Sequence, residues 1–291
     1  MNGIDFNSLI PLLESVAGGA IGAGVLKGPV TTLNDWWYVH FGANTDLARK
    51  KKEILNQSKI EAYKRDIFNE VKDIPAKNIK EPQLDIIGPA LEASKYYIDE
   101  PELRKMFAKL VASSMDASSS HVTRSAFVEF VKQMNPVDAQ LLSYLSKKGQ
   151  APLGRIDNHF ANNKGYNILF SSLLSNDVPI SSDLRAGLPS AIQNLVRLSL
   201  VETTYSEFVV DLDYENLFKK TTEYSDIETK QTMDKKSFQD IINQFEKHPS
   251  SVNIEQNGID NLKKLVTANL EIARGLIRMT TLGKDFASIC L

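Results

Sequence analysis

The stretch from Glu81 to Asp116 constrains the fold most, because it contains the ends and apolar faces of two helices. At the break between them, Asp99 can accept hydrogen bonds from the free backbone N–H groups of the second helix, and Glu102 follows three residues later. Pro101 suits a first helical turn, where its missing N–H costs nothing. The apolar residues at helical spacing are Leu84, Ile87, Leu91 and Ile98, then Leu103, Met106, Phe107, Leu110 and Val111. The segment therefore predicts a pair of amphipathic helices.

Length, cysteine usage and charge exclude several classes of protein. A chain of 291 residues can bury a sizeable core without disulfides. Its single cysteine, Cys290, excludes a cysteine-rich metal site and fits a reducing compartment. A net charge of −2 argues against a surface that coats nucleic acid throughout. The N-terminal sequence MNGIDFNS is not a basic signal segment, so we expect a cytoplasmic protein.

Residues 9–30 form an apolar, glycine-rich segment. Glu14 and Lys27 leave residues 15–26 as its longest uncharged run, which is too short to span a bilayer comfortably. Gly18 and Gly22 have the small-xxx-small spacing that lets two helices approach closely. The segment predicts close helix packing, either inside the protein or across a dimer seam.

Aromatic and basic residues follow this segment in an order that suits a membrane surface. Trp36 and Trp37 come first, and the basic cluster Arg49, Lys50, Lys51 and Lys52 follows. One interpretation is a protein peripheral to the inner membrane, with the tryptophans as interfacial anchors and the cluster as the electrostatic contact. The other is a soluble helical domain with both tryptophans in its core and the cluster on a solvated face. Both interpretations stay open.

The remaining chain predicts further helices and a small sheet. Residues 47–71 have the pattern of a long surface helix, and the proline-containing stretch 73–83 reads as a linker. Asn135 and Pro136 begin another helix, which ends near Gly149. A helix at 188–198 precedes strands at 200–205 and 207–213, and a last strand at 276–280 precedes a closing helix with Phe286 and Ile289 inward. This order is typical of a winged helix, here with a charged insertion at 215–267.

A winged helix raises the alternative of a DNA-binding regulator. Its candidate nucleic-acid contacts are Arg185, Gln193, Asn194 and Arg197. Because non-specific affinity comes mainly from neutralised phosphates, two arginines support only weak, salt-sensitive association. Protein contact or a structural role is therefore favoured over nucleic acid.

The sequence patterns of common reactive sites are missing. The glycines form neither GxxxxGK[ST] nor GxGxxG, and no GxSxG occurs. The four histidines lack the spacing of zinc ligands. Asp211, Asp213 and Glu215 could hold magnesium, but charged residues at a strand edge or turn explain them as well. We predict no catalytic residue, cofactor, metal or small-molecule substrate, and hence a protein that is not an enzyme.

Several separated blocks carry a resemblance to a known family. They are IIGPALEA, DEPELR and MFAKLVASSMD within residues 86–116, then AFVEFVKQMNPVDAQLL, NLVRLSLVE and LGKDFASICL. In this wording and order the chain resembles the bacterial abortive-infection alpha (Abi-alpha) family. The resemblance implies a role in antiviral defence against phage and brings no known reaction with it.

The expected architecture is mainly α, in three parts. An N-terminal helical arm at 1–75 precedes a helical middle domain at 76–134 and a winged-helix-like α+β module at 135–291. The hypothesis for function is an abortive-infection protein that acts through protein or membrane contacts. A protein partner or a homo-oligomer is expected.

Overall fold

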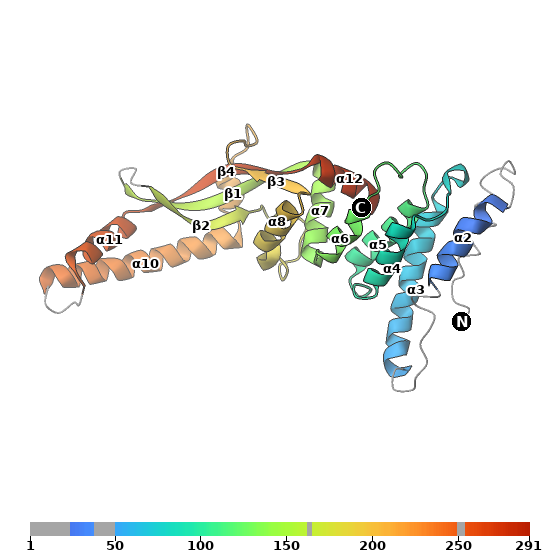
Figure 1. Ribbon diagram of the computed structural model, residues 1–291. Helices are drawn as coiled ribbons and strands as arrows, with labels where there is room; N and C mark the ends of the chain where they lie inside the picture. The colour runs from blue at the N-terminus through green and yellow to red at the C-terminus, as the bar shows by residue number, and fades with distance from the viewer. Residues whose placement is uncertain (1–23, 38–49, 162–164, 249–253) are drawn as a thin grey trace. The chain divides into compact units, whose positions relative to one another are not determined.

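The computed structural model describes residues 24–37, 50–161, 165–248 and 254–291 (Figure 1). It confirms a mainly helical protein with a small antiparallel sheet. The chain divides into two compact units: a helical unit of residues 1–146, 197–200 and 280–291, and a sheet unit of residues 147–196 and 201–279. The three-part domain division expected from sequence stays a prediction.

In the helical unit, helix α5 lies in the middle and packs against four others, α3, α4, α6 and α12. All five apolar positions predicted for its inner face are buried. The described elements of this unit are α2 (Gly24–Trp37), α3 (Lys50–Lys72), a 3-10 turn (Ala76–Asn78), α4 (Leu84–Ser94), α5 (Pro101–Ser114), α6 (Ala126–Lys132), α7 (Pro136–Lys148, whose last turn enters the sheet unit) and α12 (Thr281–Cys290). The predicted helix pair is confirmed, except that Leu84 is exposed and Ile86 is buried in its place.

The predicted cap at the start of α5 is wrong. The N-cap residue is Glu100, which makes no side-chain cap bond, although Pro101 is the first helical residue as expected. The Asp99 carboxylate pairs instead with Lys59 of α3. Glu102 accepts a hydrogen bond from Gln140 Nε2 of α7 at 2.9 Å. Asp99 and Glu102 therefore bond to residues of neighbouring helices and do not cap α5, although their local spacing predicted that role.

The predicted linker at 73–83 is packed into the helical unit. Ile74, Ala76 and Ile79 are buried, and Ile79 forms a β-bridge with Asp116. The backbone N–H of Lys80 donates to Met115 O at 2.9 Å. The connection from α3 to α4 is therefore held by α5 and the loop that follows it.

Helix α7 begins and ends as predicted. Asn135 Oδ1 accepts from the backbone N–H of Asp138 at 3.0 Å, and Asp138 Oδ2 accepts from the backbone N–H of Asn135 at 2.8 Å. This reciprocal arrangement is a capping box. Gly149, with φ at +76°, ends the helix, because that conformation is costly for a residue with a side chain.

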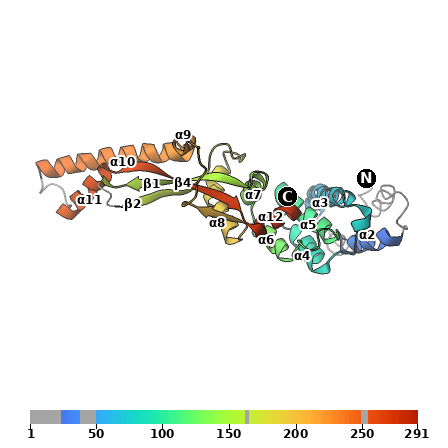
Figure 2. The same cartoon turned by 90° about the horizontal axis from the view of Figure 1, so that it is seen from above.

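The sheet unit contains a four-stranded antiparallel sheet in the order β2-β1-β4-β3. Its core includes Ile156, Leu173, Tyr214, Phe218, Tyr224 and Ile272. Both views show α10 running along the sheet (Figure 2). The strands are β1 (Gln150–His159), β2 (Tyr166–Leu173), β3 (Val201–Thr204) and β4 (Asn269–Met279), and the helices are a 3-10 turn (Arg185–Gly187), α8 (Leu188–Arg197), α9 (Tyr214–Phe218), α10 (Thr222–Lys247) and α11 (Gln256–Val266).

The strand predictions are only partly right. The helix at 188, the strand after it and the closing helix are present, but β4 begins at Asn269 and is longer than predicted. β1 and β2 lie in a region where no strand was expected. The predicted strand at 207–213 is wrong, because this segment is a turn in which Asp211 has φ at +63° and Val210 is 72% exposed. The winged-helix detail of the prediction is not confirmed.

Candidate functional site

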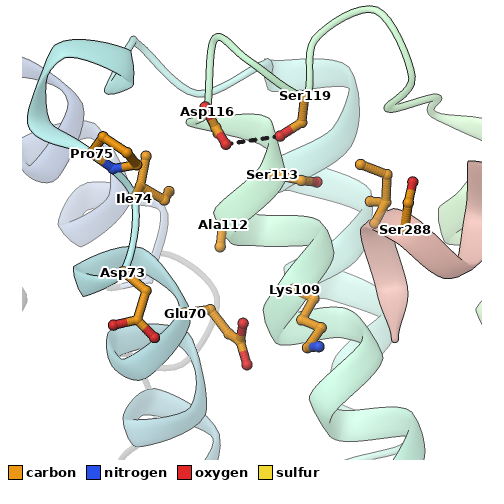
Figure 3. A pocket seen from close by; sticks show the side chains of 11 residues that line it. Glu70, Asp73, Ile74, Pro75, Lys109, Ala112, Ser113, Asp116, Ser119 and Ser288 are labelled. Atoms are coloured by element: carbon orange, nitrogen blue, oxygen red, sulfur yellow. Dashed lines mark hydrogen bonds between the residues drawn. The ribbon is translucent and has the colours of Figure 1, made fainter.

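A polar pocket of about 220 Å³ lies within the helical unit (Figure 3). The end of α3, the second half of α5, the loop after α5 and α12 surround it. Its charged side chains are Glu70, Asp73, Lys109 and Asp116. Ser113, Ser119 and Ser288 add hydroxyl groups to its lining.

Two of the four charged groups of this pocket, Asp116 and Lys109, have structural partners. Asp116 accepts from the backbone N–H of Ser118 at 2.8 Å and from Ser119 Oγ at 2.9 Å, which holds the loop after α5 in place. Lys109 Nζ donates to the main-chain oxygen of Leu291. In the part of the chain that the structure describes, no group of three or more His, Cys, Asp or Glu residues could hold a metal ion. The pocket is thus a polar recess in which the visible interactions stabilise the fold.

The two predicted membrane anchors lie at the end of α2 and pack onto neighbouring helices. Trp37 is only 9% exposed, and its ring centroid lies 5.8 Å from that of Tyr63 in α3. A Cβ atom at Gly88 of α4 would lie 2.8 Å from the Trp36 ring, so glycine is needed for this approach. The interfacial role stays a prediction.

The structure does not describe the side chains of the other residues predicted to contact a membrane or a partner. Gly18, Gly22 and Arg49 lie outside the described residues. Lys50, Lys51 and Lys52 lie in the first turn of α3, and their side chains are not described. No helix in the described ranges is both long enough and apolar enough to cross a membrane.

The arginines predicted to contact nucleic acid have protein partners. Arg185 donates to the main-chain oxygen of Leu174 at 2.8 Å and pairs with Glu223 at 3.2 Å. Arg197 donates to Gln133 Oε1 at 2.8 Å. Gln193 is exposed and Asn194 is half-buried. Nucleic-acid contact by these residues stays a prediction, and it would require Arg185 to give up its bonds.

Sequence reasoning missed an apolar surface on the edge strand β2. Three apolar side chains within four residues of this strand are exposed, namely Tyr166 by 46%, Ile168 by 52% and Leu169 by 43%. β2 is the first strand in the order of the sheet, so among the strands that the structure describes only β1 pairs with it. The sequence signal for this strand is the uncharged run from Tyr166 to Leu173. The pattern of apolar and polar residues alone does not show whether such a run forms an exposed or a buried strand.

A cleft of about 310 Å³ lies between β2 and the helix α10. Gln231 of α10 donates to Asn158 Oδ1 of β1 at 2.7 Å and so fixes the helix against the sheet beside the cleft. Lys230, Asp234 and Lys235 of α10 line it with charge. Its apolar lining is Leu169, Ile227, Phe238 and Leu265. We call this space the β2 cleft.

On the other face of the sheet, charged and aromatic groups hold the start of β2. Arg155 donates two hydrogen bonds to the buried Asp157, at 2.8 and 2.7 Å. These bonds raise the pKa of the Arg155 guanidinium above its ordinary value. The Tyr166 ring stacks on His159 with centroids 4.9 Å apart and also lies against Arg155. The position of Tyr166 is thereby set from β1.

The fold and these surfaces define a mainly helical protein with a small antiparallel sheet and an apolar edge strand. The chain belongs to the abortive infection alpha family, whose model matches residues 55–290 and hence most of the sequence. An uncharacterized protein from the hydrocarbon-degrading marine bacterium Alcanivorax borkumensis SK2 has a solved structure that matches at 16% identity. That match covers 60% of this chain and 94% of the other, with a TM-score of 0.32. No curated protein matches the chain.

The single thiol is expected to be unreactive in the folded protein. Cys290 is 1% exposed, and burial raises its pKa well above the ordinary value, although the charge of Lys109 opposes this shift. Because the thiolate is the reactive form, Ellman's reagent at about pH 8 should not label the native protein, and labelling should follow unfolding in guanidinium. Rapid reaction of the native protein would contradict this burial.

Proposed function

We propose that this protein is a non-enzymatic component of abortive-infection defence and that it acts by binding another protein through its sheet unit. Family membership supports the defence role. The exposed apolar edge of β2 is the observation that supports binding of another protein as the mode of action. An exposed apolar strand edge is a template for pairing with another chain, and proteins normally protect such edges.

The two edges of the sheet differ in this protection. β3 is four residues long, and its Glu202 pairs with Arg278 of β4. β2 is eight residues long and has neither a charged residue nor a proline. Shortness and charge are two of the devices that keep an edge strand from associating, and β3 has both. The contrast within one sheet supports a binding role for β2.

Phage challenge of cells that express the protein tests this proposal. Ile168→Lys places a charge on the exposed edge, where it opposes strand pairing without disturbing the buried core. We expect this variant to lose protection, with phage plating about tenfold or more above the level with the original protein. Val210→Lys is the matched control, since Val210 is a more exposed branched side chain in a turn. Equal protection by both variants would refute the proposed surface.

The membrane hypothesis makes a different prediction in the same assay. Replacing Arg49, Lys50, Lys51 and Lys52 by glutamine removes the electrostatic contact that attachment to an anionic leaflet would need. A protein that acts through β2 keeps its protection in this variant. Loss of both protection and binding to anionic vesicles would instead favour a peripheral membrane protein.

Nucleic-acid binding is the less favoured function. The order of α8, β3, β4 and α12 keeps part of the winged-helix sequence of elements, but Arg185 is engaged by Leu174 and Glu223. A gel-shift salt series with competitor DNA tests this alternative, because phosphate contacts weaken steeply with salt.

A further inference from the structure

We infer that β2 binds an extended, acidic peptide segment of the partner protein as an added strand, with an apolar side chain of that segment in the β2 cleft. The inference rests on the proposed function and specifies the chemistry of the partner. Three features support it: free main-chain groups on the edge, an apolar cleft beneath it, and lysines at the cleft.

The main-chain groups of β2 that face outward follow from its pairing with β1. The backbone N–H of Phe160 donates to Gly165 O at 3.0 Å, so these two residues form a hydrogen-bonded pair at the end of the ladder. Along an antiparallel strand, successive residues direct their N–H and C=O groups to alternate sides. Tyr166 and Ile168 therefore direct theirs away from β1, where an added strand would bond to them.

The length of this open edge is limited by a bulge. The register between β1 and β2 shifts on both sides of Ile156, and Ser172 has φ at +66°. The Tyr205 hydroxyl lies between the strands there, since it accepts from Ser172 N–H and donates to Gly154 O, both at 3.3 Å. A regular edge is thus available only from Tyr166 to Ile168, because the first shift lies between Ile168 and Phe170, and an added strand would pair regularly with about three residues.

The β2 cleft provides a place for one side chain of the added strand. Leu169 lies on the α10 side of the sheet and lines the cleft together with Ile227 and Phe238. Side chains of an added strand alternate between the two faces of the sheet, so every second one points to the α10 side. An aliphatic or aromatic side chain beside Leu169 would cover apolar surface that is now exposed. This is the usual division in strand addition, in which main-chain bonds give affinity and pockets give specificity.

Charge at the cleft favours an acidic partner. Lys230 and Lys235 line the β2 cleft and form no ion pair with another residue that the structure describes. Lys264 of α11 lines the adjoining hollow, and Asp234 is the one acidic residue in the lining of either. Carboxylates two residues before or after the buried side chain of the segment would lie on the same face and would meet these lysines.

The same charges disfavour a second copy of this chain on the edge. A two-fold dimer brings the same surface of both subunits together. Since β2 itself is uncharged, pairing it with another β2 would bring together two clefts that each carry two lysines and one acid, and would place the two basic rims near each other. An acidic segment of a different protein avoids this repulsion.

Binding of a defined peptide to the full chain tests the inference. The probe is a fluorescein-labelled peptide of about eight residues with threonine at every second position, and the positions between, which share one face of the strand, alternate valine and glutamate. Its counterpart has lysine in place of glutamate. Fluorescence anisotropy at low salt should show binding of the glutamate peptide only. In the same complex, hydrogen exchange at the amides of Tyr166 and Ile168 should slow.

Two charge-reversed variants with equal net charge separate a local from a general effect. K230E/K235E alters the cleft and should weaken binding of the glutamate peptide by about tenfold. K236E/K247E alters two exposed lysines of the same helix that do not line the cleft, and it should change the dissociation constant by less than about twofold. Equal effects of the two pairs would overturn the inference, as would equal binding of the two peptides.

The remaining outcomes distinguish failure of the inference from failure of the proposed function. If Ile168→Lys loses phage protection while the glutamate peptide does not bind, the protein-contact function stands and the acidic partner is wrong. If the peptide binds as expected and Ile168→Lys still protects, the proposed function is wrong. A dimer in sedimentation that Ile168→Lys disperses would show that a second copy occupies the edge, which overturns the acidic partner.

Discussion

Gly283→Ala is expected to destabilise the helical unit by about 3 kcal/mol or more. A Cβ atom at this position would lie 1.9 Å from Leu200 O and 2.8 Å from Leu200 C. Both are backbone atoms, so no side-chain rotation can relieve the overlap. The first turn of α12 is also fixed there, because Thr280 Oγ1 accepts from the Gly283 N–H at 2.9 Å and the Thr280 N–H donates to Leu200 O at 3.1 Å. Urea unfolding followed by circular dichroism measures the loss.

Gly28→Ala is the matched control for this substitution. A Cβ atom at Gly28 would lie 2.5 Å from Glu81 Oε1, the end of a flexible side chain that can move aside. Alanine also favours a helix interior over glycine, so the net change in unfolding free energy should stay within about 1 kcal/mol. Similar unfolding midpoints for the two variants would show that α12 does not need its close approach to Leu200.

Phe218→Ala is expected to destabilise the sheet unit by about 3–5 kcal/mol. Phe218 is fully buried, and its ring lies 3.0 to 3.2 Å from where a Cβ atom at Gly154 would be. It also contacts Tyr214, with ring centroids 5.7 Å apart. Alanine would leave a cavity between α9 and β1.

Phe208→Ala removes a phenyl ring from a partly exposed position and serves as the control for Phe218→Ala. Phe208 is 40% exposed and lies over Arg274, whose guanidinium carbon is 4.0 Å from the ring centroid. We expect a loss of about 1 kcal/mol, from the cation–π contact and partial burial. Thermal unfolding of both variants compares the two losses of stability, and equal shifts in melting temperature would contradict the packing of Phe218.

The elements that sequence predicted correctly are those whose signals are local. The α4–α5 pair shows its apolar spacing within one stretch, and the start of α7 shows its capping residues Asn135 and Asp138 three positions apart. Such signals depend on neighbours within one or two helical turns, so they can be read without the fold.

The strand β1 could not be predicted in this way, because two adjacent polar residues within it are buried. Asp157 is 2% exposed through its bonds with Arg155, and Asn158 is 6% exposed beside Gln231 of α10. Polar residues at both faces obscure the two-residue alternation of a strand. Conversely, the segment 207–213 has the alternating pattern of a strand but forms a turn, in which the Val209 N–H donates to the Tyr214 hydroxyl at 3.1 Å.

The candidate contact residues show the same limit. Arg185 reads as a free basic side chain, yet its partners Leu174, Ser175 and Glu223 come from other parts of the chain. The apolar edge of β2 becomes visible only once the strand order places it outermost. Family resemblance identified the class of protein from sequence, but the surface now proposed for binding required the fold.

The bulge that Tyr205 holds between Gly154 and Ser172 has an evolutionary consequence. In the binding mode proposed for β2, it would restrict recognition to a few main-chain groups and one side-chain cavity, so most positions of the partner segment could change without loss of binding. Proline at a bonded position, or reversal of the acidic character, would be the changes that abolish binding. Substitutions that escape recognition should therefore concentrate in a very short stretch of the partner.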